Sequence, residues 1–243
     1  MLMNKSRGVK ARFAPLLCAL FLLPPVAPAA SPRPDALEVL RTVRAAQAAQ
    51  HQTLRGQLSC ADHIVPFTFT MEGASIRYQF GNPPETLLLR LDETRSQLDS
   101  VSDKGKRKSA VARFDQPVAD TDLRYEDLAL SFLYWPNAKI VDEQTRLFRS
   151  CWVIQTQPAS PKDSSYSKAE LWIEKESGAL LQAEAYAHDG SLAKRFKVTE
   201  GQKINGTWFL KLMRIESTSL DSKKDRTPTY LEVLGVDPDN SKP

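Results

Sequence analysis

A thiol, a carboxylate and an imidazole lie within four residues of each other at Cys60, Asp62 and His63. Such a set can do nucleophilic chemistry, because a histidine that takes the proton of a cysteine leaves a reactive thiolate. The alternative is that Cys60 is buried or disulfide-bonded and His63 lies in a turn, and we favour this alternative. Of the other two histidines, His188 precedes an Asp-Gly pair typical of hairpin turns, and His51 has no obvious partner.

Adjacent acids offer a second kind of candidate, at Glu126-Asp127 and at Asp142-Glu143. Hydrolysis of a glycoside needs two carboxylates that face one cleft, and neither pair has a second feature that indicates this. The sequence also contains no G-x-S-x-G, P-loop, G-x-G-x-x-G or H-E-x-x-H motif. Its cysteines and histidines are too few to indicate a metal site. We therefore expect a protein that is not an enzyme, with no catalytic residue, metal or cofactor.

Apolar side chains are the remaining candidates. Many are aromatic and recur along segments in which hydrophobic and polar residues alternate. If the segments form a curved sheet, such side chains would line a hydrophobic ligand site on its concave face. The alternative is that they only fill a core. The candidates for hydrophobic-ligand binding are Phe67, Phe69, Tyr78, Phe80, Phe132, Trp135, Trp172, Tyr186 and Met213.

The elements that must position these residues begin with a helix. Asp35 has the spacing of an N-cap with Glu38, and apolar residues then recur at helical spacing from Leu37 to about Gln50. From Thr53 the period changes to two, which predicts antiparallel strands about every ten residues. We expect a mainly β protein: one curved antiparallel sheet or incomplete barrel of about ten strands, with helices covering its concave face.

The stretch from Asp122 to Trp152 interrupts this rhythm. Asp122 is a candidate cap, and apolar residues at helical spacing run from Leu123 to Phe132 before Trp135-Pro136 ends the helix. A helix of about ten residues does not form alone in water, so it must pack on the sheet. We expect this short central helix to cover the concave face. A strand that contains Cys151 and Trp152 follows it.

The first thirty residues have the composition of a cleaved secretory signal peptide. Four basic residues precede the apolar run Phe13 to Leu23, and small residues with an A-x-A spacing follow at Ala27 and Ala29. Removal of residues 1–30 would take four basic and no acidic residues from 33 basic and 29 acidic, which leaves 29 of each. A nucleic-acid-binding role then loses the excess positive charge on which it depends. We expect a periplasmic location, one domain over residues 31–236 and a disordered tail at 237–243.

Export also bears on the two cysteines that would survive cleavage, Cys60 and Cys151. An oxidising compartment favours a disulfide between them, whereas the alternative is two buried free thiols. We predict a disulfide between Cys60 and Cys151.

Four motifs, taken in order, resemble the LolA-like outer-membrane lipoprotein-sorting proteins, and in particular a divergent branch of that family. They are the helix start Asp122 to Leu128 (DLRYEDL), the Cys-Trp strand, the strand and turn Leu171 to Leu181 (LWIEKESGALL) and the closing strand Trp208 to Ile215 (WFLKLMRI). The resemblance extends over about Leu54 to Ile215.

This resemblance implies an incomplete β-barrel whose hydrophobic cavity takes the acyl chains of lipoproteins or lipids and carries them for outer-membrane sorting. Expected partners are therefore lipoprotein acyl chains or lipid, an inner-membrane transporter and, transiently, a membrane, with the protein itself a monomer. The alternative is a lipid-sensing or protein-interaction module of the same fold without transport activity. In the better-known carriers an arginine on a strand holds the lid helices closed, and no residue of this sequence is matched to it.

Overall fold

The structure is a computed structural model, and it describes residues 33–61, 63–218 and 227–237. The chain divides into two units, residues 1–32 and residues 33–243, and only the second contains described residues. The predicted signal peptide, the candidate Asp62 and the tail beyond Asp237 therefore lie outside the described residues. In the described part, no helix has both the length and the hydropathy needed to cross a bilayer.

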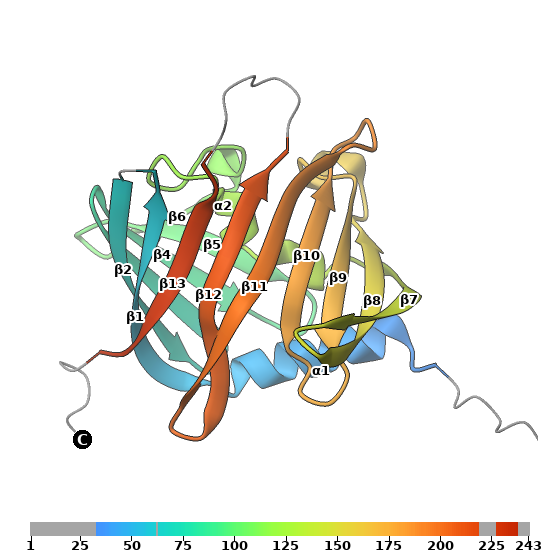
Figure 1. Cartoon of the computed structure of the whole chain (residues 1–243). Helices are drawn as coiled ribbons and strands as arrows, with labels where there is room; N and C mark the ends of the chain where they lie inside the picture. The colour runs from blue at the N-terminus through green and yellow to red at the C-terminus, as the bar shows by residue number, and fades with distance from the viewer. Residues whose placement is uncertain (1–32, 62, 219–226, 238–243) are drawn as a thin grey trace, which may run out of the picture. The chain divides into compact units, whose positions relative to one another are not determined.

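The helix at the start of the second unit is α1, Ala36–Ala48 (Figure 1). Asp35 is its N-cap, as predicted, because a carboxylate oxygen of Asp35 accepts a hydrogen bond from the Glu38 amide at 3.1 Å. Leu40 and Val43 are buried in the main core, so the apolar stripe of the helix packs against the sheet.

Thirteen strands form a single sheet in the described residues, and every pairing is antiparallel. The predicted fold class is confirmed, with three strands more than the ten or so expected. The strands are β1 His51–Cys60, β2 His63–Glu72, β3 Ser75–Gly81, β4 Pro84–Leu91, β5 Ser96–Val101, β6 Arg107–Ser109, β7 Asn137–Arg146, β8 Arg149–Gln157, β9 Lys168–Glu174, β10 Leu180–Tyr186, β11 Leu192–Ile204, β12 Thr207–Ser217 and β13 Thr229–Val236.

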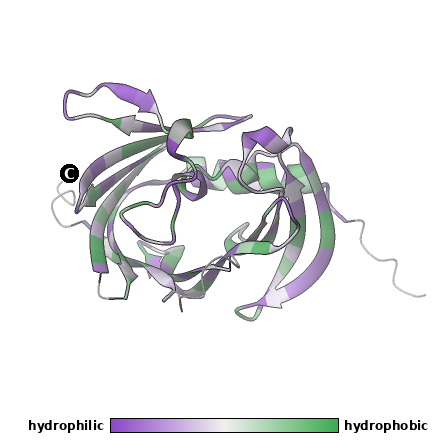
Figure 2. Cartoon of the chain, turned by 90° about the horizontal axis from the view of Figure 1, so that it is seen from above, coloured by the Kyte–Doolittle hydropathy of each residue, from purple (hydrophilic) through white to green (hydrophobic). Residues whose placement is uncertain are grey.

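The order of the strands is β6-β5-β4-β3-β2-β1-β13-β12-β11-β10-β9-β8-β7, so the sheet consists of two meanders joined where β1 pairs with β13. Seen from above, the strands curve around an interior, and hydrophobic and hydrophilic residues alternate along them (Figure 2). The two free edges of the sheet, β6 and β7, are consecutive in the sequence. The connection between them, residues 110–136, must therefore pass from one edge of the sheet to the other.

The connection contains three short helices, which are η1 Val111–Arg113, α2 Tyr125–Leu128 and η2 Ser131–Leu133. The predicted central helix is thus broken, because Leu130 has a left-handed backbone with φ of 53° between α2 and η2. The predicted cap is also wrong, since Arg124 and not Asp122 is the N-cap of α2. Phe132, Leu133 and Trp135 are buried in the main core, so this segment covers the concave face as expected. One further short helix, η3 Pro161–Asp163, precedes β9.

A smaller second cluster lies on the opposite face of the sheet. It contains Cys151, Val153 and Trp172. The end of β7 crosses this face, because Gln144 accepts a hydrogen bond from the Trp172 indole at 3.0 Å and the Arg146 guanidinium lies 5.0 Å from the centre of the Trp172 ring. Trp172 belongs to β9, two places from β7 in the sheet, so the β7–β8 hairpin folds back over the convex face.

The predicted disulfide is wrong, because Cys60 and Cys151 are both free. Their strands, β1 and β8, are six places apart in the sheet, which is about 29 Å along the sheet at ~4.8 Å per strand. A disulfide needs Cα atoms within about 7 Å of each other. Two thiols, the alternative that the sequence left open, are what the fold contains.

Gly56 in β1 makes the packing of the main core possible near the centre of the sheet. It pairs with Phe67 in β2, and the ring of Phe67 lies over it. A Cβ atom on residue 56 would lie 2.6 Å from Cζ of Phe67 and 2.5 Å from the carbonyl oxygen of Glu232. Only glycine leaves room for this ring against the strand.

We therefore expect Gly56→Ala to lower the free energy of unfolding by about 1–3 kcal/mol, the usual cost of overpacking a core. Urea denaturation measures the change. Gly201→Ala is the matched control, because a Cβ there would meet Trp208 at an ordinary 3.5 Å. Equal stabilities of the two variants would contradict the role assigned to Gly56.

Candidate functional site

An apolar pocket of about 180 Å³ lies on the concave face. Three of the predicted residues, Phe67, Phe69 and Tyr78, contribute to its lining from β2 and β3. The ring of Phe67 also packs against Phe80, with 5.9 Å between the ring centroids. Burial raises the pKa of Tyr78, so its hydroxyl stays neutral at physiological pH. The full lining is Leu54, Phe67, Phe69, Tyr78, Phe209, Leu210, Leu231 and Val233.

The other predicted residues divide between the two faces of the sheet. Phe80, Phe132 and Trp135 are buried in the core that surrounds the pocket, and Met213 packs against it beside Leu231, its partner in the β12–β13 pairing. Sequence reasoning missed the pocket residues of β1, β12 and β13. The alternation of Leu54 with Gly56 and of Leu231 with Val233 was the available signal.

Trp172 and Tyr186 do not join the pocket, which corrects their prediction as ligand-binding residues. Trp172 is in the second cluster on the convex face. The Tyr186 hydroxyl donates to Glu184 at 2.9 Å, and the Lys168 ammonium lies 4.0 Å from the centre of its ring. Both aromatics alternate in sequence with small or aliphatic residues, and these neighbours are the ones that face the core.

The connection between β6 and β7, residues 110–136, is called the covering segment below. The four residues of α2, Tyr125 to Leu128, hold this segment in place through different contacts. The Tyr125 hydroxyl bonds to Glu85 of β4 and to Arg113 of η1. Leu128 is buried in the main core. The two acids between them, Glu126 and Asp127, are almost fully buried, with 2% and 5% of their surface exposed. Of the two pairs of adjacent acids in the sequence, Glu126-Asp127 thus has a structural role, whereas Asp142 and Glu143 are exposed on β7.

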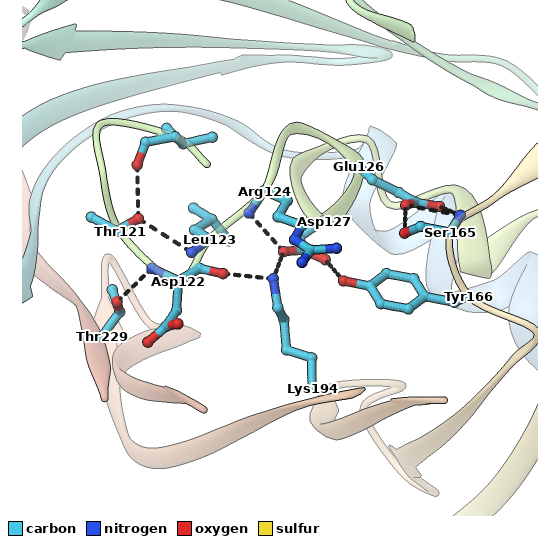
Figure 3. A network of polar contacts seen from close by, with 11 residues as sticks. Thr121, Asp122, Leu123, Arg124, Glu126, Asp127, Ser165, Tyr166, Lys194 and Thr229 are labelled. Carbon is cyan, nitrogen blue, oxygen red and sulfur yellow. Dashed lines mark hydrogen bonds and ion pairs between the residues drawn. The ribbon is translucent and has the colours of Figure 1, made fainter. Parts of the chain in front are cut away.

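Asp127 forms the centre of a buried polar network (Figure 3). One carboxylate oxygen accepts from the Lys194 ammonium at 2.6 Å and from the Arg124 amide at 2.7 Å, and the other accepts from the Tyr166 hydroxyl at 2.8 Å. Lys194 also donates to the carbonyl oxygen of Asp122 at 2.5 Å. The side chains of Lys194 and Asp127 are each 2% exposed. We call the interaction of Lys194 with Asp127 and Asp122 the Lys194 latch.

Two further contacts extend the network to the loop before β9. Glu126 accepts hydrogen bonds from the hydroxyls of Ser164 and Ser165. Tyr166 is buried, and its burial, together with the nearby Asp127 carboxylate, raises its pKa well above the usual value, so it remains a donor. The covering segment is therefore held by β4, by β11 through Lys194 and by the loop at Ser164 to Tyr166.

A second hollow of about 330 Å³ lies beside the turn between β3 and β4. Three of its polar residues, Glu85, Arg113 and Tyr125, bond to one another. Because these groups already satisfy one another, the hollow offers little to an apolar chain. It is lined by Pro83, Pro84, Glu85, Arg113, Pro117, Ala119, Asp120 and Tyr125.

Cys60 and His63 are backbone partners at the end of the β1–β2 pairing, but the side chains of the catalytic candidates bond to other groups. The Cys60 thiol donates to the carbonyl oxygen of Thr227, and the His188 ring contacts the carbonyl oxygen of Ser164 at 3.1 Å. Asp189 accepts from the amide and hydroxyl of Ser191, which lower its carboxyl pKa. Among the described residues, no group of three or more histidine, cysteine or acidic side chains is arranged to hold a metal ion.

Several solved structures have the same fold as this chain. One is an outer membrane lipoprotein-sorting protein domain from Vibrio parahaemolyticus, with a TM-score of 0.64 and 13% identity, which covers 82% of this chain and 90% of that chain. A LolA superfamily protein from Nitrosomonas europaea has a TM-score of 0.60 and 14% identity over 83% and 92% of the two chains. A DUF1329 family protein from Desulfovibrio piger has a TM-score of 0.56 and 16% identity over 82% and 92%.

At these identities the likeness establishes the fold, and the predicted resemblance to LolA-like proteins is confirmed at that level. No curated protein matches the chain in sequence. A family model described as "Uncharacterized protein" matches residues 102–241, which is more than half of the chain and includes the covering segment, the Lys194 latch and β13. The chain belongs to this family, and it has the fold of the LolA-like lipoprotein-sorting proteins.

Proposed function

We propose that the protein is a carrier that binds the acyl chains of lipoproteins or lipids without covalent chemistry, in the cavity between the sheet and the covering segment, for sorting to the outer membrane. The observation that carries this proposal is the apolar pocket lined by Phe67, Phe69 and Tyr78. Burial of acyl methylenes would drive binding, at about 0.8 kcal/mol for each buried group.

The size of the pocket supports a cover that moves. Pockets for small molecules usually measure about 300–1,000 Å³, whereas this pocket has about 180 Å³. Its lining residues Phe67 and Val233 belong to the same core cluster as Leu128, Phe132 and Leu133 of the covering segment. Movement of that segment away from the sheet would therefore uncover one continuous apolar surface large enough for an acyl chain.

The Lys194 latch has the position needed to control that movement. Lys194 is on β11, and both of its partners, Asp122 and Asp127, are on the covering segment. We propose that Lys194 has the role that a strand arginine has in the better-known carriers. A buried ion pair contributes modestly while it is intact but is costly to break by removing one partner, because the other charge stays buried.

The remaining features follow from the same proposal. Residues 1–30 would be removed on export, residues 31–236 would act as a single periplasmic domain, and the protein would work as a monomer. It would exchange its acyl ligand with an inner-membrane transporter and make transient contact with a membrane. It needs no cofactor and no catalytic residue for this task.

We expect delipidated protein to bind a fatty acid that carries a fluorescent group, measured by titration of the fluorescence. Leu231→Trp should weaken this binding about tenfold or more, because overfilling a packed site costs about 1–3 kcal/mol. The control is Leu234→Trp on the same strand, where the side chain is 56% exposed. Absence of binding by the delipidated wild type, or equal affinity of both variants, would falsify the carrier proposal. Mass spectrometry of copurified lipid would then identify the natural ligand.

For the Lys194 latch, we expect Lys194→Met to lower the free energy of unfolding by about 3–5 kcal/mol, because Asp127 is left buried without its cation. The double variant with Asp127→Asn should recover part of this loss. Urea denaturation measures both, and ligand release should also be faster in Lys194→Met. Lys211→Met is the control, because the ion pair of Lys211 with Glu200 is exposed. A double variant that loses as much as the sum of its single changes would contradict a coupled pair.

A further inference from the structure

The tip of the β7–β8 hairpin displays two large apolar side chains to solvent. Phe148 is fully exposed, with a relative exposure of 101%, and Leu147 is 43% exposed. Neither residue belongs to a core cluster of the described residues. The side chains of Leu147 and Phe148 therefore do not contribute to the hydrophobic core of this unit.

The backbone of this tip makes the choice of residues more unusual. Leu147 and Phe148 both have left-handed φ angles, of 48° and 60°. Two-residue hairpin turns of this kind favour Asn-Gly, and the chain uses Asn205-Gly206, with φ angles of 50° and 84°, at the β11–β12 hairpin. Left-handed backbone costs a residue such as Leu or Phe about 1–2 kcal/mol. Leu147 and Phe148 are unfavourable in this turn and do not pack in a core, which indicates that they serve a function.

The tip is also held firmly. The Arg146 guanidinium stacks on Trp172 and donates to Gln182 at 3.0 Å, and Gln144 accepts from the Trp172 indole. These contacts fasten the end of β7 to the convex face of β9 and β10. Phe148 is thus presented by an anchored hairpin.

A second exposed aromatic lies at the same end of the sheet. Trp208 follows the β11–β12 turn, is 62% exposed and has the Lys203 ammonium 5.3 Å from the centre of its ring. Because the strands alternate in direction, β8 and β12, four places apart, both start at this end. Figure 1 shows both hairpins in its lower half.

The charges around the two tips favour contact with an anionic surface. Thr145 to Cys151 contains two arginines and no acid, and Gln202 to Lys211 contains two lysines and no acid. Of these, Arg149 and Lys211 have acidic partners only in exposed pairs, which bind weakly. Exposed aromatic and aliphatic residues beside basic residues match the interface of a bilayer with anionic head groups.

We propose that the β7–β8 and β11–β12 hairpin tips form a docking face that places Phe148 and Trp208 in the interface of an anionic lipid bilayer. This proposal rests on the proposed carrier function, which includes a transient contact with a membrane. It adds which end of the protein makes that contact. Its physical basis is separate, because neither Phe148 nor Trp208 lines the acyl pocket, although Phe209 and Leu210, which follow Trp208, do.

The test is cosedimentation with phosphatidylcholine vesicles that do or do not contain phosphatidylglycerol. The wild type should bind the anionic vesicles and not the neutral ones. The variant Leu147→Asn/Phe148→Gly should bind them about tenfold more weakly, since the burial of one Phe is worth at least that factor. The same variant should unfold at a higher urea concentration, because its turn is relaxed. Trp208→Ser should weaken vesicle binding further.

Ile64→Ser is the matched control, because Ile64 is 57% exposed at the start of β2, at the opposite end of the sheet. It should bind vesicles like the wild type. The proposal is overturned if the wild type ignores anionic vesicles, if the Asn-Gly variant binds them unchanged, or if Ile64→Ser loses binding equally. All proteins compared carry the same N-terminal segment, so its contribution cancels. Fatty-acid binding by the Asn-Gly variant should be unchanged, which separates a failure of docking from a failure of the carrier proposal.

Discussion

The pairing of β1 with β13 is the constraint on which the rest of the structure depends. It joins the two meanders side by side, so that β6, the last strand of the first meander, and β7, the first strand of the second, become the free edges of one curved sheet. Those edges are consecutive in the sequence, so the connection between them must run from one edge of the sheet to the other. Its buried apolar residues, such as Phe132 and Leu133, place it over the concave face.

The connection combines the two kinds of interaction that a movable cover needs. Its apolar residues, such as Phe132 and Leu133, pack on the sheet without strict direction, whereas Asp127 must meet Lys194 and Tyr166 in one geometry. Dispersion and hydrophobic contacts can be exchanged for similar contacts with a ligand. A buried ion pair has no such substitute, so it gives the closed position a defined geometry.

Periodicity was enough to predict the fold class and the N-cap Asp35, because both are local patterns. The alternation of Val65, Phe67 and Phe69 identified one face of β2, and Phe67 and Phe69 on that face line the apolar pocket. The same kind of pattern gave the wrong face for Trp172 and Tyr186, because alternation separates the two faces of a strand and does not show which face is concave. The latch was not predictable, since Lys194 lies 67 residues from Asp127 and reads as a surface lysine. The disulfide failed for a similar reason, because spacing along the chain does not show that five strands of the sheet lie between β1 and β8.

The β1–β13 pairing also determines how late in synthesis the sheet can be completed. The first strand of the sheet has the last strand as one of its two neighbours, and β13 ends only at Val236. During synthesis β1 thus presents an unsatisfied edge until almost the whole chain exists, and contacts of such long sequence separation form slowly. A chain with this order of strands stays unfinished while it is being made, and it completes its sheet only after release.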